Sequence, residues 1–269
     1  MLESQKNGQN VKLSIILPVR NEAFNLRVMA KILLVSVDVP CELLVVYDFK
    51  EDETVPVVND LERAYSNVHG IHNTLGVGVV NAIRAGMKVA KGECILIFAT
   101  DEVGPVMAIE DMLELMNQGC DFISCTRYAH GGRRLGGSAI GGVLSRLANW
   151  LFHVIARSAF TDSTTGIKMF RRPIFDQLHL EAKPVGWAVA FEMALKAQLL
   201  GLKLGEVPVI SVDRLYGGKS SFKLGPWLNE YLRWFLWGVP RLRGVTSGRQ
   251  SNVVVRVPSL GGNKGKGQE

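Results

Sequence analysis

Short, continuous apolar runs alternate with longer segments of helical period from Leu13 to about Pro208, and no other feature of the 269-residue chain constrains its fold more. Such runs are typical of strands buried on both faces, as in a parallel sheet covered by helices. The expected strands are 13–19, 42–48, 68–72, 94–100 and 121–128. Apolar stripes over 79–90 and 109–116 predict helices that cover the sheet. The predicted fold class is α/β, with a mainly parallel, twisted sheet flanked by helices.

Composition limits the size and the surroundings of this fold. A length of 269 residues suits one large domain with appendages, and 47% hydrophobic residues are enough for a sizeable core. No apolar run reaches the ~18 residues of a membrane-spanning helix, and residues 1–10 lack the apolar stretch of a secretory signal. We therefore expect a cytoplasmic protein. Its four cysteines, which form no CxxC pair, are expected to be reduced and buried.

The chain changes character after residue 137. Apolar residues recur along one side of a helical segment over 140–155, and a second amphipathic helix, 226–243, carries three tryptophans and leads into arginines. Trp and Tyr favour the bilayer interface and Arg favours anionic lipid, so both helices are expected to rest on the inner face of a membrane. Packing on the domain's own surface or on a partner subunit is the alternative, which leaves a homo-oligomer open. The predicted organisation is a flexible N-terminus 1–10, one domain over 11–225, the aromatic helix 226–243 and a flexible basic tail 244–269.

The net charge of +6 favours anionic partners, which include phosphates, nucleic acid and an acidic membrane face. A nucleic-acid partner is not expected, because the chain has no basic groove with interleaved aromatic residues and no known nucleic-acid motif.

Polar and charged residues follow the expected strands where each strand ends. In open sheets of this kind, ligands bind beyond the carboxyl ends of the strands. The segments at these ends are 18–22, 48–54, 100–102 and 126–128 with the glycine-rich 131–137. Acidic residues in such places also serve as turn formers and helix caps, so spacing alone leaves both interpretations open.

Eight segments, in order, resemble the motifs of the family 2 glycosyltransferases, most closely those of the polyprenyl-phosphate (dolichyl-phosphate mannose synthase-like) branch. The resemblance covers about residues 11–223. The segments are LPVRNE at 17–22, YDFKEDET at 47–54, NTLGVGVVNAI at 73–83, TRY with GG over 126–132, DSTTG at 162–166, GW through FE over 186–192, EVP at 206–208 and RLYGGKS at 214–220. Eight motifs in the family's order over some 200 residues make a chance match implausible.

The resemblance implies a GT-A fold with a Rossmann-like nucleotide-binding half, and a nucleotide-diphosphate sugar as donor. The residues it assigns to the donor are Pro18, Arg20, Asn21, Glu22, Asp48, Asp52, Gly78, Thr100 and Asp101. The residues it assigns to the acceptor are Arg127, Arg133, Arg134, Asp162, Arg214 and Lys219. The expected catalytic residues are Asp101, Arg127 and Glu192, and Asp101 is the expected ligand of Mg²⁺ or Mn²⁺.

The expected chemistry depends on the acceptor. Departure of the nucleoside diphosphate develops negative charge, which a divalent cation and nearby arginines offset. An acceptor phosphate is already ionised at neutral pH and needs no general base. A hydroxyl acceptor does need one, and Glu192 is then the candidate.

The chain departs from the family at the metal motif. The usual D-x-D reads Ala99-Thr100-Asp101, so the first carboxylate is missing, and Glu102 would point to the opposite side of an extended strand. Either Asp101 binds the metal with more water in its shell, or metal dependence is weak, or the site is inactive. Three functions therefore compete. Transfer of a sugar to polyprenyl phosphate at the cytoplasmic membrane face leads, ahead of transfer to a soluble saccharide hydroxyl and of a non-catalytic GT-A partner or nucleotide-sugar-binding protein.

Overall fold

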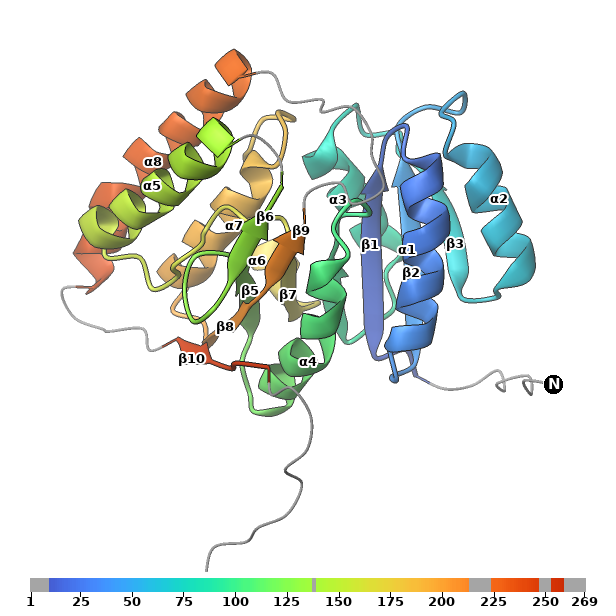
Figure 1. Cartoon of the computed structure of the whole chain (residues 1–269), viewed down its shortest axis with the longest axis horizontal. Coiled ribbons are helices and arrows are strands. Elements are labelled where there is room, and N and C mark those ends of the chain that lie inside the picture. Colours follow the sequence, from blue (N-terminus) through green and yellow to red (C-terminus); the bar gives the residue numbers. More distant parts are fainter. Residues whose placement is uncertain (1–9, 137–138, 213–223, 247–252, 259–269) are drawn as a thin grey trace, which may run out of the picture.

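A central sheet sandwiched between helices organises the chain (Figure 1). The computed structural model describes residues 10–136, 139–212, 224–246 and 253–258. Within these residues, eight strands form one sheet in the order β10-β8-β5-β7-β4-β1-β2-β3, and β6 and β9 pair as a small second sheet. All neighbours in the large sheet are parallel except β7, which runs antiparallel to β4 and β5. The predicted α/β class with a mainly parallel sheet is confirmed.

The five predicted strands are all present. The large sheet consists of β1 Leu13–Val19, β2 Cys41–Tyr47, β3 Val68–His72, β4 Cys94–Ile97, β5 Phe122–Thr126, β7 Lys168–Arg171, β8 Leu204–Pro208 and β10 Val254–Val255, and the small sheet of β6 Arg133–Leu135 and β9 Ile210–Val212. β4 is shorter than predicted: Phe98 donates one last ladder bond to Ile16 O at 3.0 Å, and the chain then turns at Thr100 and Asp101. Glu102 therefore follows a turn and is not part of an extended strand as predicted. Its Oε2 accepts a hydrogen bond from Ser211 Oγ at 3.1 Å.

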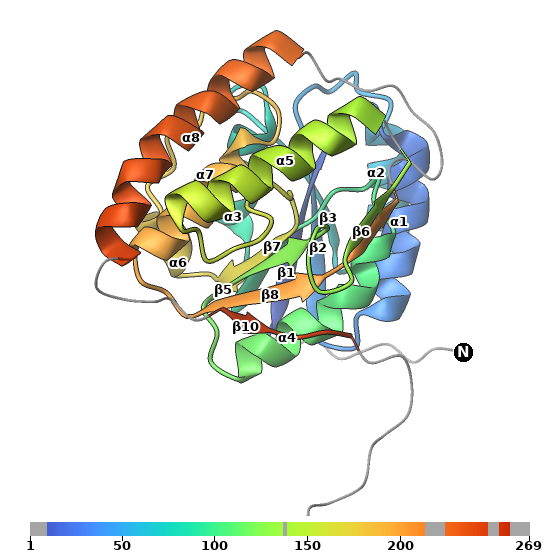
Figure 2. The same cartoon turned by 60° about the vertical axis from the view of Figure 1, so that its left-hand side comes forward.

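Helices cover both faces of the sheet and form two apolar cores. On one face lie α1 Ala23–Ser36, α2 Val55–Ala64, the 3₁₀ turn Gly104–Ala108 and α4 Ile109–Asn117. On the other lie α3 Val79–Val89, α6 Ile174–Gln177 and α7 Ala188–Leu199. α8 Leu224–Thr246 packs on α7, and α5 Ala139–Ala156 packs on α8, which makes an outer layer at the end of the molecule away from α1 and α2 (Figures 1 and 2).

The apolar stripe of α5 faces outward. Val143, Trp150 and Val154 are 67%, 58% and 54% exposed, whereas Asn149 and Phe152 on the opposite side of the helix are buried. α8 likewise exposes a leucine at every fourth position. We call this surface the outer apolar face, and its members are Val143, Leu144, Leu147, Trp150, Val154, Ile155, Leu228, Leu232 and Leu236. In the part of the chain that the structure describes, no helix combines the length and hydropathy needed to cross a bilayer.

Part of the expected flexible tail is ordered, so the prediction for 244–269 is wrong for the described residues. α8 continues to Thr246, and Val254–Val255 adds the edge strand β10 beside β8. Arg256 Nε then lies 2.5 Å from Asp111 Oδ1 of α4, which ties this strand to the domain. The four cysteines are reduced thiols, and all but the half-buried Cys41 are buried, as predicted.

Candidate active site

One edge of the large sheet carries most of the residues predicted to bind the donor and the acceptor. Because β1, β2, β4 and β5 are parallel, the segments that follow them start at the same edge. β7 runs the other way, with Lys168 opposite Ile97 and Ser124, so the segment 161–167 that precedes it lies at this edge too. The topology therefore brings 18–22, 48–54, 100–102, 126–128 and the DSTTG segment together.

Asp48 fastens the turn that leads into α3. Its Oδ1 accepts a hydrogen bond from Asn73 Nδ2 at 2.7 Å, and its Oδ2 accepts one from the Gly78 N–H at 3.0 Å. Gly78 has a φ of +117°, which favours glycine, and it caps α3. A carboxylate has about four acceptor positions, so Asp48 retains capacity for a ligand while it holds this turn.

Asp52 ties two loops together and is 5% exposed. Both of its oxygens accept the Asn21 N–H, at 3.1 and 3.0 Å, and Oδ1 also accepts the Thr54 N–H at 2.8 Å and its hydroxyl. Glu22 joins the same cluster, because its N–H donates to Thr54 Oγ1 at 3.1 Å. The carboxylate of Asp52 thus shapes the loop around Asn21, which has a left-handed φ of 54°. Direct nucleoside contact by Asp52 stays a prediction, and the bonds observed give it a positioning role.

The remaining residues predicted to bind the donor differ in exposure. Arg20 is exposed and lies over the Phe49 ring at 5.6 Å, and Pro18 is half-buried at the end of β1. Thr100 is buried, and Asp101 is half-buried in the turn after β4. Among the described residues, no group of three or more His, Cys, Asp or Glu side chains could hold a metal ion. Mg²⁺ in enzymes is commonly bound by one or two carboxylates together with substrate phosphates, and Asp101 in this turn fits that arrangement.

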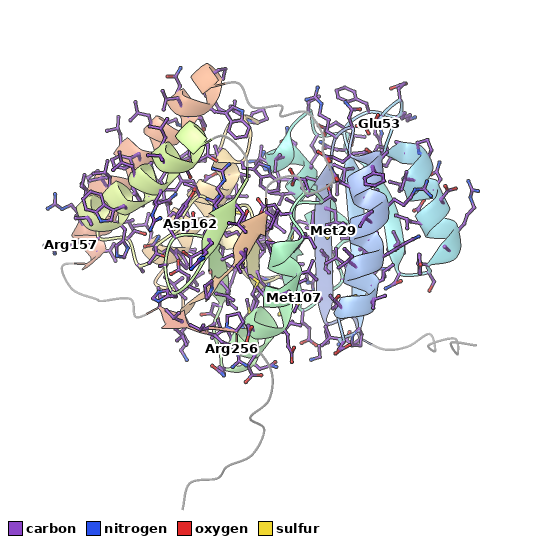
Figure 3. The ribbon with its side chains drawn as sticks, in the orientation of Figure 1. Met29, Glu53, Met107, Arg157, Asp162 and Arg256 are labelled. Carbon is purple, nitrogen blue, oxygen red and sulfur yellow. The ribbon has the colours of Figure 1, made fainter. Side chains whose placement is uncertain are left out.

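The Arg127–Asp162 pair is the strongest electrostatic feature of the site. Arg127 donates from Nε to Asp162 Oδ2 at 2.7 Å and from a terminal nitrogen to Oδ1 at 3.1 Å, and its backbone N–H donates to Oδ2 at 3.2 Å. The Asp162 side chain is fully buried, and that of Arg127 is 12% exposed. Burial alone would raise the pKa of Asp162, but the charge and hydrogen bonds of Arg127 outweigh it and lower that pKa. Figure 3 labels Asp162 on the α5 side of the molecule.

Three buried polar residues that the sequence reasoning did not assign support this pair. Asn149 of α5 donates to Thr164 Oγ1 at 2.9 Å and accepts from the Ser163 N–H at 3.0 Å. Glu206 of β8 accepts from the Thr161 N–H and hydroxyl, both at 2.9 Å, and burial raises its pKa to about 7. The third is Lys168 of β7, whose amine is buried.

That amine is Lys168 Nζ, which donates to Ser124 Oγ at 2.6 Å. Burial lowers the pKa of Lys168 to about 8, although the negative charge of Asp162 acts in the opposite direction. Glu206 stands in the EVP segment noted above, which was the available signal for it. Lys168 stands in none of the family-like segments and only interrupts an apolar run, so the sequence did not indicate a role for it.

The other basic residues assigned to the acceptor are distributed differently. Arg133 is exposed and Arg134 half-buried on β6, whose start is fixed by the bond from the Arg133 N–H to Val209 O at 2.9 Å. Arg214 and Lys219 lie outside the described residues.

Glu192 is not available as a general base in this structure. It has no exposed surface, and its two oxygens accept the N–H groups of Glu181 and Ala182 at 2.5 and 2.7 Å. Lys196 Nζ, one turn along α7, lies 2.7 Å from Oε1. A carboxylate in these surroundings has no face open to an acceptor, so the expectation of a catalytic role is replaced by one in holding the chain at 181–182.

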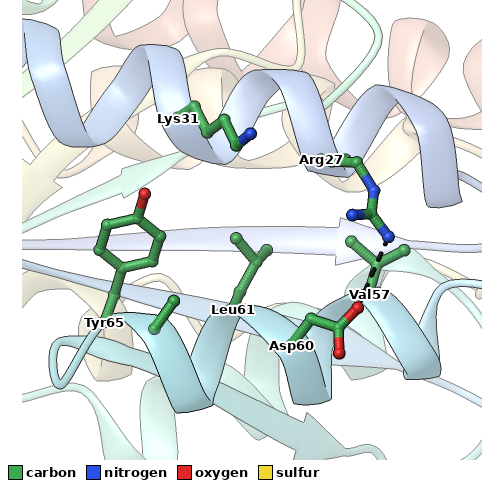
Figure 4. Close-up of a pocket in the computed structure, with 7 residues that line it drawn as sticks. Arg27, Lys31, Val57, Asp60, Leu61 and Tyr65 are labelled. Atoms are coloured by element: carbon green, nitrogen blue, oxygen red, sulfur yellow. Dashed lines mark ion pairs between the residues drawn. The ribbon is translucent and has the colours of Figure 1, made fainter.

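A cavity of about 260 Å³ lies elsewhere, between α1 and α2 (Figure 4). Arg27, Lys31 and Tyr65 border it, and Arg27 pairs with Asp60 at 3.6 Å across it. None of the residues predicted to bind donor or acceptor lines this cavity.

Comparison with solved structures identifies the fold. The chain resembles the glucosyl-3-phosphoglycerate synthase of Mycobacterium tuberculosis in complex with Mn²⁺, UDP and glucosyl-3-phosphoglycerate, with a TM-score of 0.64 at 16% identity. The match covers 86% of this chain and 80% of that one, and a complex of the same synthase with Mg²⁺ and UDP matches equally, with a TM-score of 0.64. The predicted GT-A fold is thereby confirmed.

The family follows from the sequence match. The family model described as Glycosyl transferase family 2 matches residues 14–178, which is more than half of the chain. The chain therefore belongs to this family. It is 26% identical over 211 residues to Glycosyltransferase AglD of Haloferax volcanii, a match covering 74% of this chain and 33% of that protein. It is also 26% identical over 239 residues to the dolichol-phosphate mannosyltransferase of Pyrococcus furiosus, covering 83% of this chain and 62% of that one. The chain thus spans less than two thirds of the length of either relative. The predicted enzyme class, a family 2 glycosyltransferase, is confirmed.

Proposed function

We propose that this chain transfers a sugar from a nucleotide-diphosphate sugar to polyprenyl phosphate at the cytoplasmic face of a membrane. The outer apolar face carries the proposal, because many exposed apolar residues on two helices that pack together are typical of a binding surface. Five exposed arginines lie on the same two helices or directly after α5; they are Arg146, Arg157, Arg233, Arg241 and Arg243. Helices 139–156 and 224–246 together carry one acidic residue, Glu230, which is 3% exposed. Helices that combine exposed apolar residues with exposed arginines suit anionic lipid.

Polar contacts join this surface to the predicted acceptor site. Asn149 extends from the inner side of α5 to Ser163 and Thr164, next to Asp162. On the preceding turn of α5, Ser145 Oγ accepts a hydrogen bond from the Tyr128 hydroxyl at 2.8 Å. An acceptor whose phosphate lies near the bilayer surface would therefore meet the Arg127–Asp162 pair under α5. The relative named dolichol-phosphate mannosyltransferase supports an acceptor of this class.

A phosphate acceptor also suits the state of Glu192. An oxygen of the ionised phosphate attacks the anomeric carbon of the donor, the bond from that carbon to the diphosphate oxygen breaks, and the nucleoside diphosphate leaves with the bonding electrons. No proton has to be removed, so a carboxylate committed to the chain at 181–182 is no obstacle. A divalent cation held by Asp101 would supply charge neutralisation for the departing diphosphate. Arg133, which is exposed on β6, would offset charge on the acceptor.

Two measurements test the proposal. Cosedimentation with vesicles of phosphatidylcholine and phosphatidylglycerol tests the surface, comparing the wild type with L147E/L232E. The control is V35E/M107E, which changes two apolar residues that are more exposed, at 82% and 76%, and lie away from the outer apolar face. Loss of two inserted leucines is expected to weaken vesicle binding by about a hundredfold or more, while the control binds as the wild type does.

The second measurement tests the acceptor class. Transfer from UDP-glucose and from GDP-mannose, with Mn²⁺ present, is followed to a polyprenyl phosphate in detergent and to a soluble methyl glycoside. Product on the lipid phosphate alone is expected. Product on the glycoside alone would establish the hydroxyl acceptor instead, and equal vesicle binding by both double variants would remove the membrane from the proposal.

A further inference from the structure

Residues 180–187, which connect α6 to α7, lie between the outer helix α8 and both halves of the predicted site. We call them the bridge segment. Arg84 of α3 donates to Leu180 O at 2.6 Å at one end, and the Val185 N–H donates to Lys183 O at 2.7 Å in the middle. The segment thus has a defined course, and side chains from three helices set it.

Two buried carboxylates from different helices hold the bridge segment. Glu192 of α7 accepts the N–H groups of Glu181 and Ala182, as described above. Glu230 of α8 accepts the next one, the Lys183 N–H, at 3.1 Å on Oε1. The same oxygen accepts from Arg233 at 2.6 Å and from Trp234 Nε1 at 3.2 Å. Glu230 is therefore a junction between α8 and the bridge segment.

On the donor side, the bridge segment contacts the turn that Asp48 holds. A Cβ built on Gly78 would lie 2.7 Å from Pro184 Cβ and 3.0 Å from Pro184 O, so the two backbones touch. Gly78 is also the residue whose N–H donates to Asp48 Oδ2. The position of Pro184 therefore limits where the N-terminus of α3, and with it Asp48, can lie.

On the acceptor side, the bridge segment contacts the end of the DSTTG segment. A Cβ on Gly166 would lie 2.8 Å from the Trp187 ring, and a Cβ on Gly186 would lie 2.2 Å from the Trp227 ring of α8. α8 is thus packed against the bridge segment at two places, through Trp227 and through Glu230.

From these contacts we infer that Glu230 is a positioning residue for the donor site. It fixes the bridge segment against Gly78 and so sets the position of the turn that Asp48 holds. The inference rests on the proposed nucleotide-sugar transfer, and it adds that the helix bearing part of the outer apolar face also governs donor affinity. Glu230 touches neither donor nor acceptor; it acts through Lys183 and Pro184.

The test compares E230L, which removes the acceptor of the Lys183 N–H, with E230Q, whose amide oxygen still accepts it. The control is E181Q, because Glu181 lies on the same segment with an exposed side chain. Hydrogen exchange is followed by mass spectrometry over 180–187 and over 74–82. E230L is expected to raise the exchange rate about tenfold in both segments, because a buried amide loses its acceptor. E230Q is expected to raise it less, and E181Q is expected to change it in neither segment.

Donor affinity gives the second readout. With Mn²⁺ and whichever of UDP-glucose and GDP-mannose binds the wild type, E230L is expected to raise the dissociation constant and the donor KM about tenfold while kcat per folded molecule stays near the wild-type value. A merely destabilised fold would lower the active fraction and leave the donor KM unchanged. If E230L does not fold, E230Q shows the same direction at smaller size.

Faster exchange over 180–187 with unchanged exchange over 74–82 would overturn the inference, and so would a wild-type donor KM in E230L. Absence of donor binding by the wild type would instead count against the proposed function, and the exchange over 74–82 would still decide whether Glu230 sets that turn.

Discussion

Substitution of Asp162 by Asn tests whether the buried ion pair organises the acceptor side. The wild-type carboxylate accepts five hydrogen bonds. Three come from Arg127, and the other two come from the N–H and hydroxyl of Thr164, at 3.2 and 3.1 Å. An Asn side chain keeps one acceptor oxygen and turns an NH₂ group toward donors, whichever way the amide is oriented. It also leaves the guanidinium of Arg127, 12% exposed, without its counter-charge.

The expected loss follows from these contacts. One charge-assisted hydrogen bond is worth about 1.5–3 kcal/mol and one ordinary bond about 0.5–1.5 kcal/mol. Removing one partner of a buried pair costs about 3–5 kcal/mol in other proteins. We therefore expect D162N to lower the free energy of unfolding by roughly 3–4 kcal/mol, a large part of the ~5–15 kcal/mol that holds a domain folded.

Urea unfolding followed by far-UV circular dichroism measures this change. D60N is the matched control, because Arg27 and Asp60 form an ion pair at 3.6 Å in which both side chains are 53% exposed, and such a pair is worth about 0–1 kcal/mol. The double variant R127Q/D162N is expected to recover part of the loss, since it also removes the uncompensated charge. A loss in D162N no larger than that in D60N would refute the reasoning.

Three further changes test single features of the site. Burial raises the pKa of Glu206 from 4.5 to about 7, so the folded state binds its proton more tightly than the unfolded state. The wild type should then lose about 3 kcal/mol of stability between about pH 4.5 and pH 7, and E206Q should lack this loss in urea titrations across that range. G78A is expected to lower the melting temperature more than G131A does. Both glycines have a positive φ, at +117° and +91°, but of the two only Gly78 is crowded, by Pro184. Equal losses in thermal unfolding would mean that Pro184 moves aside for the added methyl group. E192Q should lower the melting temperature and keep transfer within about tenfold of the wild type, whereas complete loss in a stable variant would restore Glu192 as a general base.

The sequence predicted those strands whose burial makes them continuous apolar runs. β1 and β3 begin and end where expected, and β2 differs by one residue at each end. β7 and β8 were missed, because Lys168 and Glu206 interrupt their apolar pattern. Both side chains are buried only because Ser124 and Thr161 satisfy them. These partners lie 44 and 45 residues away in the chain, and local periodicity carries no information about them.

The predicted site was recoverable to the same extent. Strand ends indicated where Asp48, Asp101 and Arg127 would gather, because the ends of parallel strands share an edge. The sequence did not indicate what each carboxylate contacts. Asp52 and Glu192 stand in family-like segments, and yet their oxygens accept hydrogen bonds from backbone N–H groups of this chain. Whether an acidic side chain faces a ligand or its own backbone depends on loop geometry that spacing does not encode.

The outer helices show why the direction of an amphipathic stripe must come from tertiary contacts. A helix on a water-soluble surface turns its apolar side inward, but α5 turns Val143, Leu147 and Val154 outward. Asn149 accounts for this orientation, because its amide is buried only where Ser163 and Thr164 complete its hydrogen bonds. Glu230 does the same for α8 through Lys183. A buried amide or carboxylate without its partners is costly, and these two polar anchors keep their hydrogen bonds in the observed orientation. The residues of the outer apolar face are then left facing outward, while Phe152 and Trp234 on the inner sides of the two helices are buried.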